Sequence, residues 1–556
     1  MSHRVQPDTT MQTHANMCNG MPRSLWVLLQ CFVCGQDSQL WCILSLSLSV
    51  CLSPSVSHVR VPILCYILYE SMLLSTTNST SSTQNGALQG MKTFKEYVES
   101  VADTWENHRN PSDGSSRIID GVTSLELIVG NPAGDADSII SALTLAYLDT
   151  EHQEQSNDTN SRHRVVLPLI SIPQNDLALR RETVLLLQDM LQIEQSTLDR
   201  LPYIDSKGID TLLPNANDDD AAAAASVDSD HQRAVPQWTL VDHNKLVLHS
   251  DHCIPRGWME QSNVVRILDH HMDECCHLDT VGQDNEQRVI AFEDNKATVA
   301  STCTLVAERL LSFADETDAS IPADVALALV VVMLLDSINM LPSAGKVTPR
   351  DKETIHKLLK NTDWGTLKKA NSNIPFVDGG GEGSKDIQID TDRVFGILSQ
   401  SKTDLAFWKD LSVRDALRLD YKQFTTPGGH DVFGAASVLL PLDDFRAKPN
   451  LVHEVEKYMD ECGIPLLVVM SMVMTEDGAP QRSMLVTGPQ DQCELIDSMT
   501  EHLLQDETLQ STEVELTDGD DPTTTSIIIR QLVQANPRAS RKQVVPVMMG
   551  FYDKIQ

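Results

Sequence analysis

Residues 125–148 read LELIVGNPAGDADSIISALTLAYL, in which an apolar run is followed by a polar turn and then by a second apolar run. The first run, 125–129, predicts a buried β-strand, and 138–148 predicts a helix. A strand that leads through a short turn into a helix is typical of an α/β protein with a parallel sheet. The turn between them carries two carboxylates, Asp135 and Asp137.

The same alternation continues along the chain. Further strands are predicted at 165–170, 238–241 and 264–268, and further helices at 91–106, 176–193, 297–313 and 322–335. This alternation predicts a parallel sheet covered by helices on both faces. A helical segment at 391–411, followed by strands at 437–440, 465–472 and 484–487, predicts a smaller mixed α/β domain.

The 556 residues are enough for at least two cores, because a single core stops growing near ~250 to 300 residues. We expect an extension over 1–90, a first domain over 91–345 with an insertion loop at 205–235, a linker of helices and a glycine-rich loop over 346–390, and a second domain over 391–556. Apolar runs at 25–33, 40–52 and 61–74 are each broken by polar residues, and none reaches the ~18 residues of a membrane span. A targeting segment and a poorly ordered extension both remain open readings of this region.

The charge balance limits the partners. Lys and Arg number 43 against 78 Asp and Glu, for a formal net charge of -35. Such a chain repels polyanions at long range, which argues against a general nucleic-acid binder and requires metals and a local basic pocket for any anionic substrate. We expect no membrane association of the folded body and a cytoplasmic location, with an organelle or secretory route left open by the N-terminal runs. The scattered cysteines indicate neither a disulfide framework nor a zinc cluster.

Polar groups follow several of the predicted strands, where open α/β sheets place their ligands. Asp242-His243-Asn244 follows the strand at 238–241, and Asp269-His270-His271 follows the strand at 264–268. Asp336 ends an aliphatic helix. Mixed imidazole and carboxylate groups suit Mn, Co or Mg. The plainer alternatives are that Asp137 or Ser138 caps the helix after the turn, and that the Asp-His pairs are structural.

Four segments resemble, in this order, the signature motifs of the DHH superfamily of phosphoesterases. They are the turn with Asp135 and Asp137, Asp242-His243-Asn244, Asp269-His270-His271, and Asp336 at the end of its helix. Asn536-Pro-Arg-Ala-Ser-Arg-Lys-Gln543 resembles the S-R-K-Q element of the DHHA2 domain of family II pyrophosphatases and exopolyphosphatases. Asn131 stands where family II pyrophosphatases usually have a histidine ligand, and the intact Asp269-His270-His271 differs from prune-type proteins, which tend to alter this motif. Both features resemble the eukaryotic exopolyphosphatases, and the resemblance runs from about 93 to 549.

The resemblance implies a parallel-sheet DHH domain with helices on both faces, a smaller mixed α/β DHHA2 domain and an active site in the cleft between them. It also implies two divalent cations, Mg²⁺ or Mn²⁺ with Co²⁺ as a third candidate. Asp242 is the expected bridging ligand and Asp137 the second candidate for that role. The implied metal ligands are Asp135, Asp137, Asp242, His270 and Asp336.

The implied activity is hydrolysis of the terminal phosphoanhydride bond of inorganic polyphosphate, with release of orthophosphate after attack by a metal-bridging hydroxide. The resemblance gives catalytic roles to His271, Arg541 and Lys542, and we expect Asn131 and Lys402 to join them in binding substrate. A longer chain would need further cations along the cleft, and the sequence leaves open which of the candidates line it: Arg180, Arg181, Lys346, Lys402, Arg418 and Lys422. The alternatives are an inorganic pyrophosphatase, a prune-like short-chain polyphosphatase or cyclic nucleotide phosphodiesterase, and a catalytically idle interaction module.

Overall fold

The computed structural model describes residues 25–34, 41–50, 91–109, 124–155, 164–209, 235–247, 254, 258, 260, 263–282, 286–294, 296–378, 387–426, 432–475, 480–515 and 526–555. The chain divides into two compact units, Met1–Leu88 and Gln89–Gln556. In the first unit, β1 (Leu25–Cys34) and β2 (Trp41–Val50) pair as antiparallel strands. The apolar run at 61–74, most of the predicted insertion loop and the glycine-rich loop at 379–383 lie outside the described residues.

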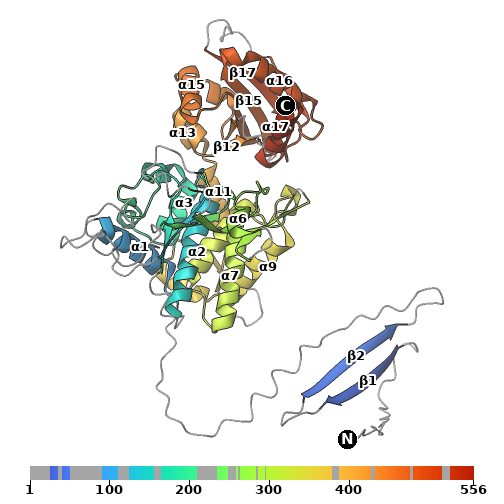
Figure 1. The fold of residues 1–556 in the computed structure, drawn as a ribbon. Helices are drawn as coiled ribbons and strands as arrows, with labels where there is room; N and C mark the ends of the chain where they lie inside the picture. The colour runs from blue at the N-terminus through green and yellow to red at the C-terminus, as the bar shows by residue number, and fades with distance from the viewer. Residues whose placement is uncertain are drawn as a thin grey trace, which may run out of the picture. The chain divides into compact units, whose positions relative to one another are not determined.

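In the second unit, helices surround a parallel sheet (Figure 1). The sheet has five strands in the order β4-β3-β5-β6-β7. Its strands are β3 (Ser124–Val129), β4 (Arg164–Leu169), β5 (Gln237–Val241), β6 (Val264–Asp269) and β7 (Arg288–Ile290). The sheet confirms the predicted α/β class, although β7 is too short for its apolar pattern to have been recognised. The chain places β4 on one side of β3 and β5 on the other, which creates a crevice beyond their carboxyl ends.

Both faces of this sheet are covered. Ile128, Val241 and Leu268 belong to a core that also contains the buried faces of the long helices. Trp238 and Leu240 point to the opposite face, where a second core forms. The long helices of this part are α1 (Phe94–Arg109), α2 (Ala136–Gln155), α7 (Thr302–Thr317), α8 (Ala323–Asp336), α9 (Pro349–Asn361) and α11 (Thr391–Lys402), and the short ones are α4 (Gln195–Leu198), α6 (Leu278–Val281) and α10 (Trp364–Ala370).

Helix α8 lies at the centre of this core, and every residue from Val325 to Leu334 is buried. Its uninterrupted apolar sequence is therefore explained by packing on all sides. Among the described residues, no helix combines the length and apolarity needed to cross a membrane. Two small hairpins accompany the core: β8 (Phe292–Glu293) with β9 (Lys296–Ala297), and β10 (Phe376–Asp378) with β11 (Ile387–Ile389), and a 3₁₀ turn, η8, spans Pro342–Ala344.

The prediction of one continuous helix over 176–193 is wrong. The segment consists of a 3₁₀ turn, η2 (Gln174–Leu179), a short helix, α3 (Arg181–Leu185), and a π turn, η3 (Leu186–Met190). The break falls at Arg180, whose ψ of 68° is far from the helical value. Apolar spacing does not reveal this break, because the side chain of Arg180 is buried at this position.

The rest of the unit is built on a six-stranded sheet in the order β12-β13-β14-β15-β17-β16, in which only the β13–β14 pair is parallel. This mixed sheet confirms the predicted second α/β part. Its strands are β12 (Tyr421–Thr425), β13 (Val432–Val438), β14 (Leu467–Met474), β15 (Pro480–Pro489), β16 (Ser511–Val514) and β17 (Ile527–Gln534). Its helices are α12 (Leu405–Asp410), α13 (Val413–Arg418), α14 (Leu442–Arg446), α15 (Leu451–Cys462), α16 (Cys493–Gln505) and α17 (Arg541–Ile555), with a 3₁₀ turn, η9, at Gln490–Gln492.

We call the two parts the first lobe, residues 91–402, and the second lobe, residues 404–555. The segment 391–411, predicted as one helix, is divided between them because the Asp404 side chain caps α12 by accepting the Ala406 N–H at 3.0 Å. The predicted domain boundaries at 345 and 391 remain predictions.

Candidate active site

The turn after β3 is closed by Gly130. A β-carbon there would lie 2.6 Å from Ser138 Cβ and 2.8 Å from the Ser138 carbonyl oxygen, so a side chain would force the turn open. The close approach lets the Asn131 backbone N–H donate to the Ser138 hydroxyl at 3.0 Å. The carboxylate of Asp135 accepts the Ser138 N–H at 3.0 Å, so the cap of α2 is Asp135 rather than Asp137 or Ser138.

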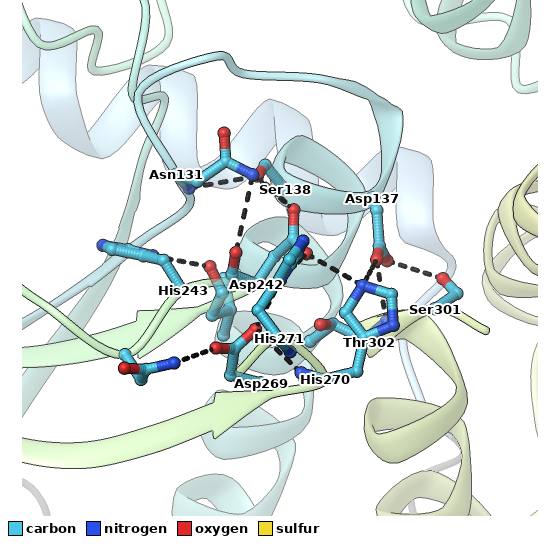
Figure 2. A network of polar contacts seen from close by, with 12 residues as sticks. Asn131, Asp137, Ser138, Asp242, His243, Asp269, His270, His271, Ser301 and Thr302 are labelled. Atoms are coloured by element: carbon cyan, nitrogen blue, oxygen red, sulfur yellow. Dashed lines mark hydrogen bonds and ion pairs between the residues drawn. The ribbon is translucent and has the colours of Figure 1, made fainter. Parts of the chain in front are cut away.

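Asp242 lies at the centre of the site (Figure 2). It follows β5 with a φ of 62°, in the left-handed region that Asp adopts more readily than most residues. Its Oδ2 accepts hydrogen bonds from Asn131 Nδ2 at 2.6 Å and from Ser138 Oγ at 2.8 Å. Its Oδ1 is buried, has no hydrogen-bond partner, and lies 3.4 Å from His270 Nε2. Although burial acts in the opposite direction, His270 and His271 hold the pKa of Asp242 well below its usual range.

His270 presents one defined nitrogen to the site. Its Nδ1 lies 3.1 Å from the carbonyl oxygen of Val299, so Nδ1 carries the proton and donates it there. The lone pair of Nε2 is then directed towards Asp242 Oδ1 and towards Asp137 Oδ2, which is 3.7 Å away. Fixing the tautomer through the far nitrogen is the usual arrangement of a metal-binding imidazole.

Asp137 is held by the N-terminus of α7. Its carboxylate accepts the Thr302 N–H at 2.7 Å, the Cys303 N–H at 2.9 Å and the Ser301 hydroxyl at 2.6 Å. Free N–H groups at a helix N-terminus favour an anion. Burial and the nearby Asp242 nevertheless raise the pKa of Asp137 to about 8, which reflects the crowding of carboxylates in the site.

Asp269 holds His270, His271 and Asn244 in place through hydrogen bonds. Its Oδ1 accepts hydrogen bonds from the backbone N–H groups of His270 and His271 and from His271 Nδ1, the last at 2.9 Å. Its Oδ2 accepts from Asn244 Nδ2 at 2.6 Å. Burial, followed by the positive charge of Lys422, lowers the pKa of His271 to about 3, so this imidazole is neutral with its proton on Nδ1.

Two further predicted ligands lie within electrostatic reach of this centre. Burial and Asp242 raise the pKa of Asp135 to about 6. Burial also raises the pKa of Asp336, with Asp242 contributing and Lys402 opposing it. The Oδ2 atom of Asp336 is buried without a hydrogen-bond partner.

The predicted cations reach this region in different ways. Arg541 donates to the Asp420 carbonyl at 2.9 Å and to Asp420 Oδ1 at 2.6 Å. Lys542 is exposed and interacts through space with Asp242 and Asp336. Lys402 pairs with the buried Glu182 at 3.1 Å, so it would have to exchange Glu182 for phosphate in order to bind substrate.

Lys422, from β12, comes closest to the histidines. Its Nζ lies 3.4 Å from His271 Nε2. The structure thereby connects the second lobe to the imidazole that the sequence analysis assigned to phosphate.

The donor set fits a divalent cation. Asp242, His270 and His271 each offer a ligand atom, and these atoms all lie within 4.8 Å of one another. A buried acceptor without a partner costs roughly 1–3 kcal/mol, and both Asp242 Oδ1 and Asp336 Oδ2 are in this position. Bound cations would satisfy these oxygens, and the mixed N,O donors suit Mg²⁺, Mn²⁺ or Co²⁺.

Residues 398–551 match the DHHA2 domain family. Three motifs follow strands and the fourth, Asp336, ends α8. Together with this match they indicate the DHH superfamily of phosphoesterases with a C-terminal DHHA2 domain. The resemblance drawn from the sequence is thereby confirmed.

Particular relatives are also similar. The chain is 24% identical over 436 residues to "Exopolyphosphatase PRUNE1" of Rattus norvegicus, covering 76% of this chain and 74% of the relative. The Homo sapiens protein of the same name is also 24% identical over 436 residues, covering 78% and 77%. Among solved structures, a putative family II inorganic pyrophosphatase from Methanococcus jannaschii is 17% identical, with a TM-score of 0.43, and covers 77% of this chain and 99% of that one.

Several residues of the site were not selected from the sequence. Ser138 was considered only as a cap, yet its hydroxyl bonds to Asp242. Ser301 is recognisable as the first of several hydroxyl residues before an apolar helix, but nothing local shows that it binds Asp137. Asp420 pairs with Arg541 across 121 positions of sequence, a contact that no local pattern reveals.

Proposed function

We propose that this chain is a divalent-cation-dependent phosphoanhydride hydrolase that removes terminal orthophosphate from inorganic polyphosphate. The observation that carries the proposal is Asp242 Oδ1, a buried carboxylate oxygen without a hydrogen-bond partner that faces His270 Nε2. The names of the relatives support the substrate class, because they are exopolyphosphatases.

In this proposal, two divalent cations would be held by Asp135, Asp137, Asp242, His270 and Asp336. When bound, such a pair supplies a nucleophile at neutral pH and neutralises phosphate charge. The protein sets the geometry beforehand. Asn131 and Ser138 fix one oxygen of Asp242 and leave the other free, and Val299 fixes the tautomer of His270.

His271 is the proposed proton-handling group. Its Nδ1–H is engaged by Asp269, while Nε2 faces Lys422 with a lone pair. When the ammonium of Lys422 turns from His271 to the substrate, a positive charge that lowers the pKa of His271 moves away. The neutral imidazole can then accept a proton on Nε2 and donate it in a hydrogen bond to a phosphoryl oxygen.

Arg541 and Lys542 are the proposed phosphoryl-binding cations of the second lobe. Asp420 engages Nη1 and Nη2 of Arg541, and a guanidinium has five N–H donors, so donors remain for phosphate. A preorganised guanidinium binds phosphate oxygens at a smaller entropic cost than a free one.

The test is a phosphate-release assay of the full chain on pyrophosphate, tripolyphosphate and long polyphosphate, with a parallel assay of cyclic nucleotide hydrolysis, each with Mg²⁺, Mn²⁺ or Co²⁺. We expect faster turnover of tripolyphosphate and long polyphosphate than of the other two substrates. Turnover of pyrophosphate alone would establish a pyrophosphatase, turnover of cyclic nucleotide alone a phosphodiesterase, and no turnover with any cation would refute the proposal.

The matched variants are Asp242→Asn and Asp279→Asn. Asn tolerates the left-handed backbone at 242, so the first variant should fold while losing roughly 100-fold or more in kcat, because a neutral amide replaces the central carboxylate. Asp279 is exposed on α6, and its variant should retain full activity. Activity retained in Asp242→Asn would contradict the assignment of the site.

A further inference from the structure

Arg180 is a buried arginine at the break between η2 and α3. Only 1% of its surface is exposed. Its four hydrogen bonds all go to backbone carbonyl oxygens: Nε to Gly134 at 3.3 Å, Nη2 to Ala133 at 2.5 Å, Nη1 to Asp176 at 3.1 Å and Nη2 to Arg418 at 3.4 Å. The first two acceptors belong to the turn after β3, and the last belongs to the second lobe.

A guanidinium is the side chain that this position requires. It carries five N–H donors in a rigid plane, whereas an ammonium has three donors at a single point. Acceptors on three separate segments can therefore be bridged by Arg but not by Lys. Burying such a charge is costly, so the position indicates a role that an apolar side chain would not fulfil.

At one end, Arg180 holds the turn that carries Asp135. Gly134 has a φ of 56°, and a β-carbon there would lie 2.3 Å from Ile172 Cγ2, so the peptide before Asp135 is already tightly confined. Arg180 binds the carbonyl groups of Ala133 and Gly134, the latter being part of the peptide bond to Asp135. The position of the Asp135 carboxylate therefore depends on this guanidinium.

At the other end, Arg180 and Arg418 bind each other's segments. Arg180 donates to the Arg418 carbonyl, and Arg418 Nη1 lies 2.7 Å from Asp176 Oδ1. The residues that follow Arg418 are those that meet the site. Asp420 holds Arg541, and Lys422 lies against His271.

We propose that Arg180 is a positioning residue that keeps the turn carrying Asp135 in register with residues 418–422 of the second lobe, so that Arg541 and Lys422 face the same phosphate as the metal ligands. Arg180 does not touch substrate in this proposal, which replaces the expectation that it lines the cleft. The inference rests on the proposed function.

The test compares Arg180→Lys with Arg200→Met, alone and combined with Arg541→Ala, in the full chain. Arg200 also lies in the first lobe and forms an ion pair with Asp103 at 2.5 Å, but these side chains are 35% and 64% exposed and neither has a proposed role in the site. Exposed pairs contribute little, so Arg200→Met is the matched control. Two quantities are measured: the Kd for imidodiphosphate with Mg²⁺, and kcat/KM for tripolyphosphate.

We expect Arg180→Lys to weaken imidodiphosphate binding about tenfold and to lower kcat/KM at least as much, in line with coupling through a shared network. Once Arg541 is removed, the further effect of Arg180→Lys should fall to about threefold or less, because its partner in the second lobe is gone. If Arg180 had a purely structural role, the fold losses of Arg180→Lys and Arg541→Ala would multiply in the double variant. The Arg200→Met variant should stay within about twofold of the wild type, and its small effect should multiply with that of Arg541→Ala.

Arg418→Met is the second variant in case Arg180→Lys does not fold, because it leaves the buried guanidinium of Arg180 and its backbone acceptors in place. It removes the return contact to Asp176 and should show the same non-additivity with Arg541→Ala. Wild-type binding in either folded variant, or multiplicative losses, would overturn the inference. If the wild type binds imidodiphosphate but does not hydrolyse tripolyphosphate, only the proposed function is refuted. The inference about Arg180 is still tested, because the Kd values of the single and double variants can be compared without turnover.

Discussion

At the level of single residues, the site depends on a few positions where the backbone is unusually confined. Asp242 has a left-handed φ of 62°, a conformation that costs roughly 1–3 kcal/mol for a residue other than glycine and is typically kept at functional sites. The hydrogen bonds from Asn131 and Ser138 offset part of this cost. In return, the conformation directs the free Oδ1 towards His270.

The turn after β3 gives a prediction at the same scale. In Gly130→Ala, the new β-carbon would meet Ser138 Cβ at 2.6 Å, so the turn must open and the Ser138 hydroxyl must move away from Asp242. We expect the free energy of unfolding to fall by about 1–3 kcal/mol and activity to fall with it. Chemical denaturation and phosphate release measure the two effects.

Gly396 provides the matched control, because a β-carbon added there in the middle of α11 meets nothing within 4 Å. Gly396→Ala should stabilise the chain by about 0.5–1 kcal/mol and leave activity unchanged. Equal stability of both alanine variants would show that the turn is not as tight as the structure indicates.

Among the elements, helix α7 binds the predicted ligand Asp137 through its N-terminus. Ser301 both caps this helix and donates its hydroxyl to Asp137. Ser301→Ala should therefore cost about 1 kcal/mol of stability and weaken cation binding roughly 10-fold to 100-fold. Titration calorimetry with Mn²⁺ measures the second effect.

Thr348 caps α9 in the same manner, by accepting from Asp351 N, and it contacts none of the proposed ligands. Thr348→Ala should lose a similar amount of stability while keeping the wild-type Kd for Mn²⁺. A parallel loss of Mn²⁺ affinity in both variants would mean that general destabilisation, rather than the contact with Asp137, is the cause.

The elements also show where sequence reasoning holds and where it fails. The strands that end at Val129, Val241 and Asp269 were predicted because buried parallel strands are short apolar runs with polar residues after them. The helix predicted over 176–193 failed at Arg180, where long-range hydrogen bonds, not local preference, set the backbone. The spacing of apolar residues indicates which positions are buried, and it misses Arg180 because the buried side chain there is positively charged.

For the whole molecule, the buried carboxylates predict a dependence of stability on cations. Asp242 and Asp336 each have a buried oxygen without a hydrogen-bond partner, so a cation that binds the folded chain but not the unfolded chain should stabilise it. At a hundredfold excess over Kd the gain is about 2.7 kcal/mol. We expect Mn²⁺ or Mg²⁺ to raise Tm by roughly a few degrees in a thermal melt, and EDTA to reverse the change.

Asp242→Asn should lose most of this shift, whereas Asp279→Asn should keep it. An unchanged Tm in wild-type chain at millimolar cation would contradict the presence of a folded-state cation site. Because this measurement does not require turnover, it separates the binding of cations from the identity of the substrate.

The candidate site was largely predictable within the first lobe and poorly predictable across the lobes. Parallel strands bring their carboxyl ends to one edge, so the order of the motifs predicted that Asp137, Asp242 and His270 would meet. The contacts of Arg180 with Arg418 and of Lys422 with His271 cross the lobes and join residues more than a hundred positions apart. Such pairings depend on the tertiary fold, and the local pattern of apolar and polar residues does not show them.

Asn131 has a consequence for metal exchange. Its Nδ2 donates to Asp242 and its Oδ1 accepts the Ala133 N–H at 2.8 Å, so the amide is fully engaged by the protein (Figure 2). A cation at Asp242 would therefore gain no imidazole from this position and, apart from His270, would be held mainly by carboxylate oxygens, which are harder donors. Ions held in this way are readily replaced, so the ion present would follow the supply in the surroundings rather than a strong preference of the protein.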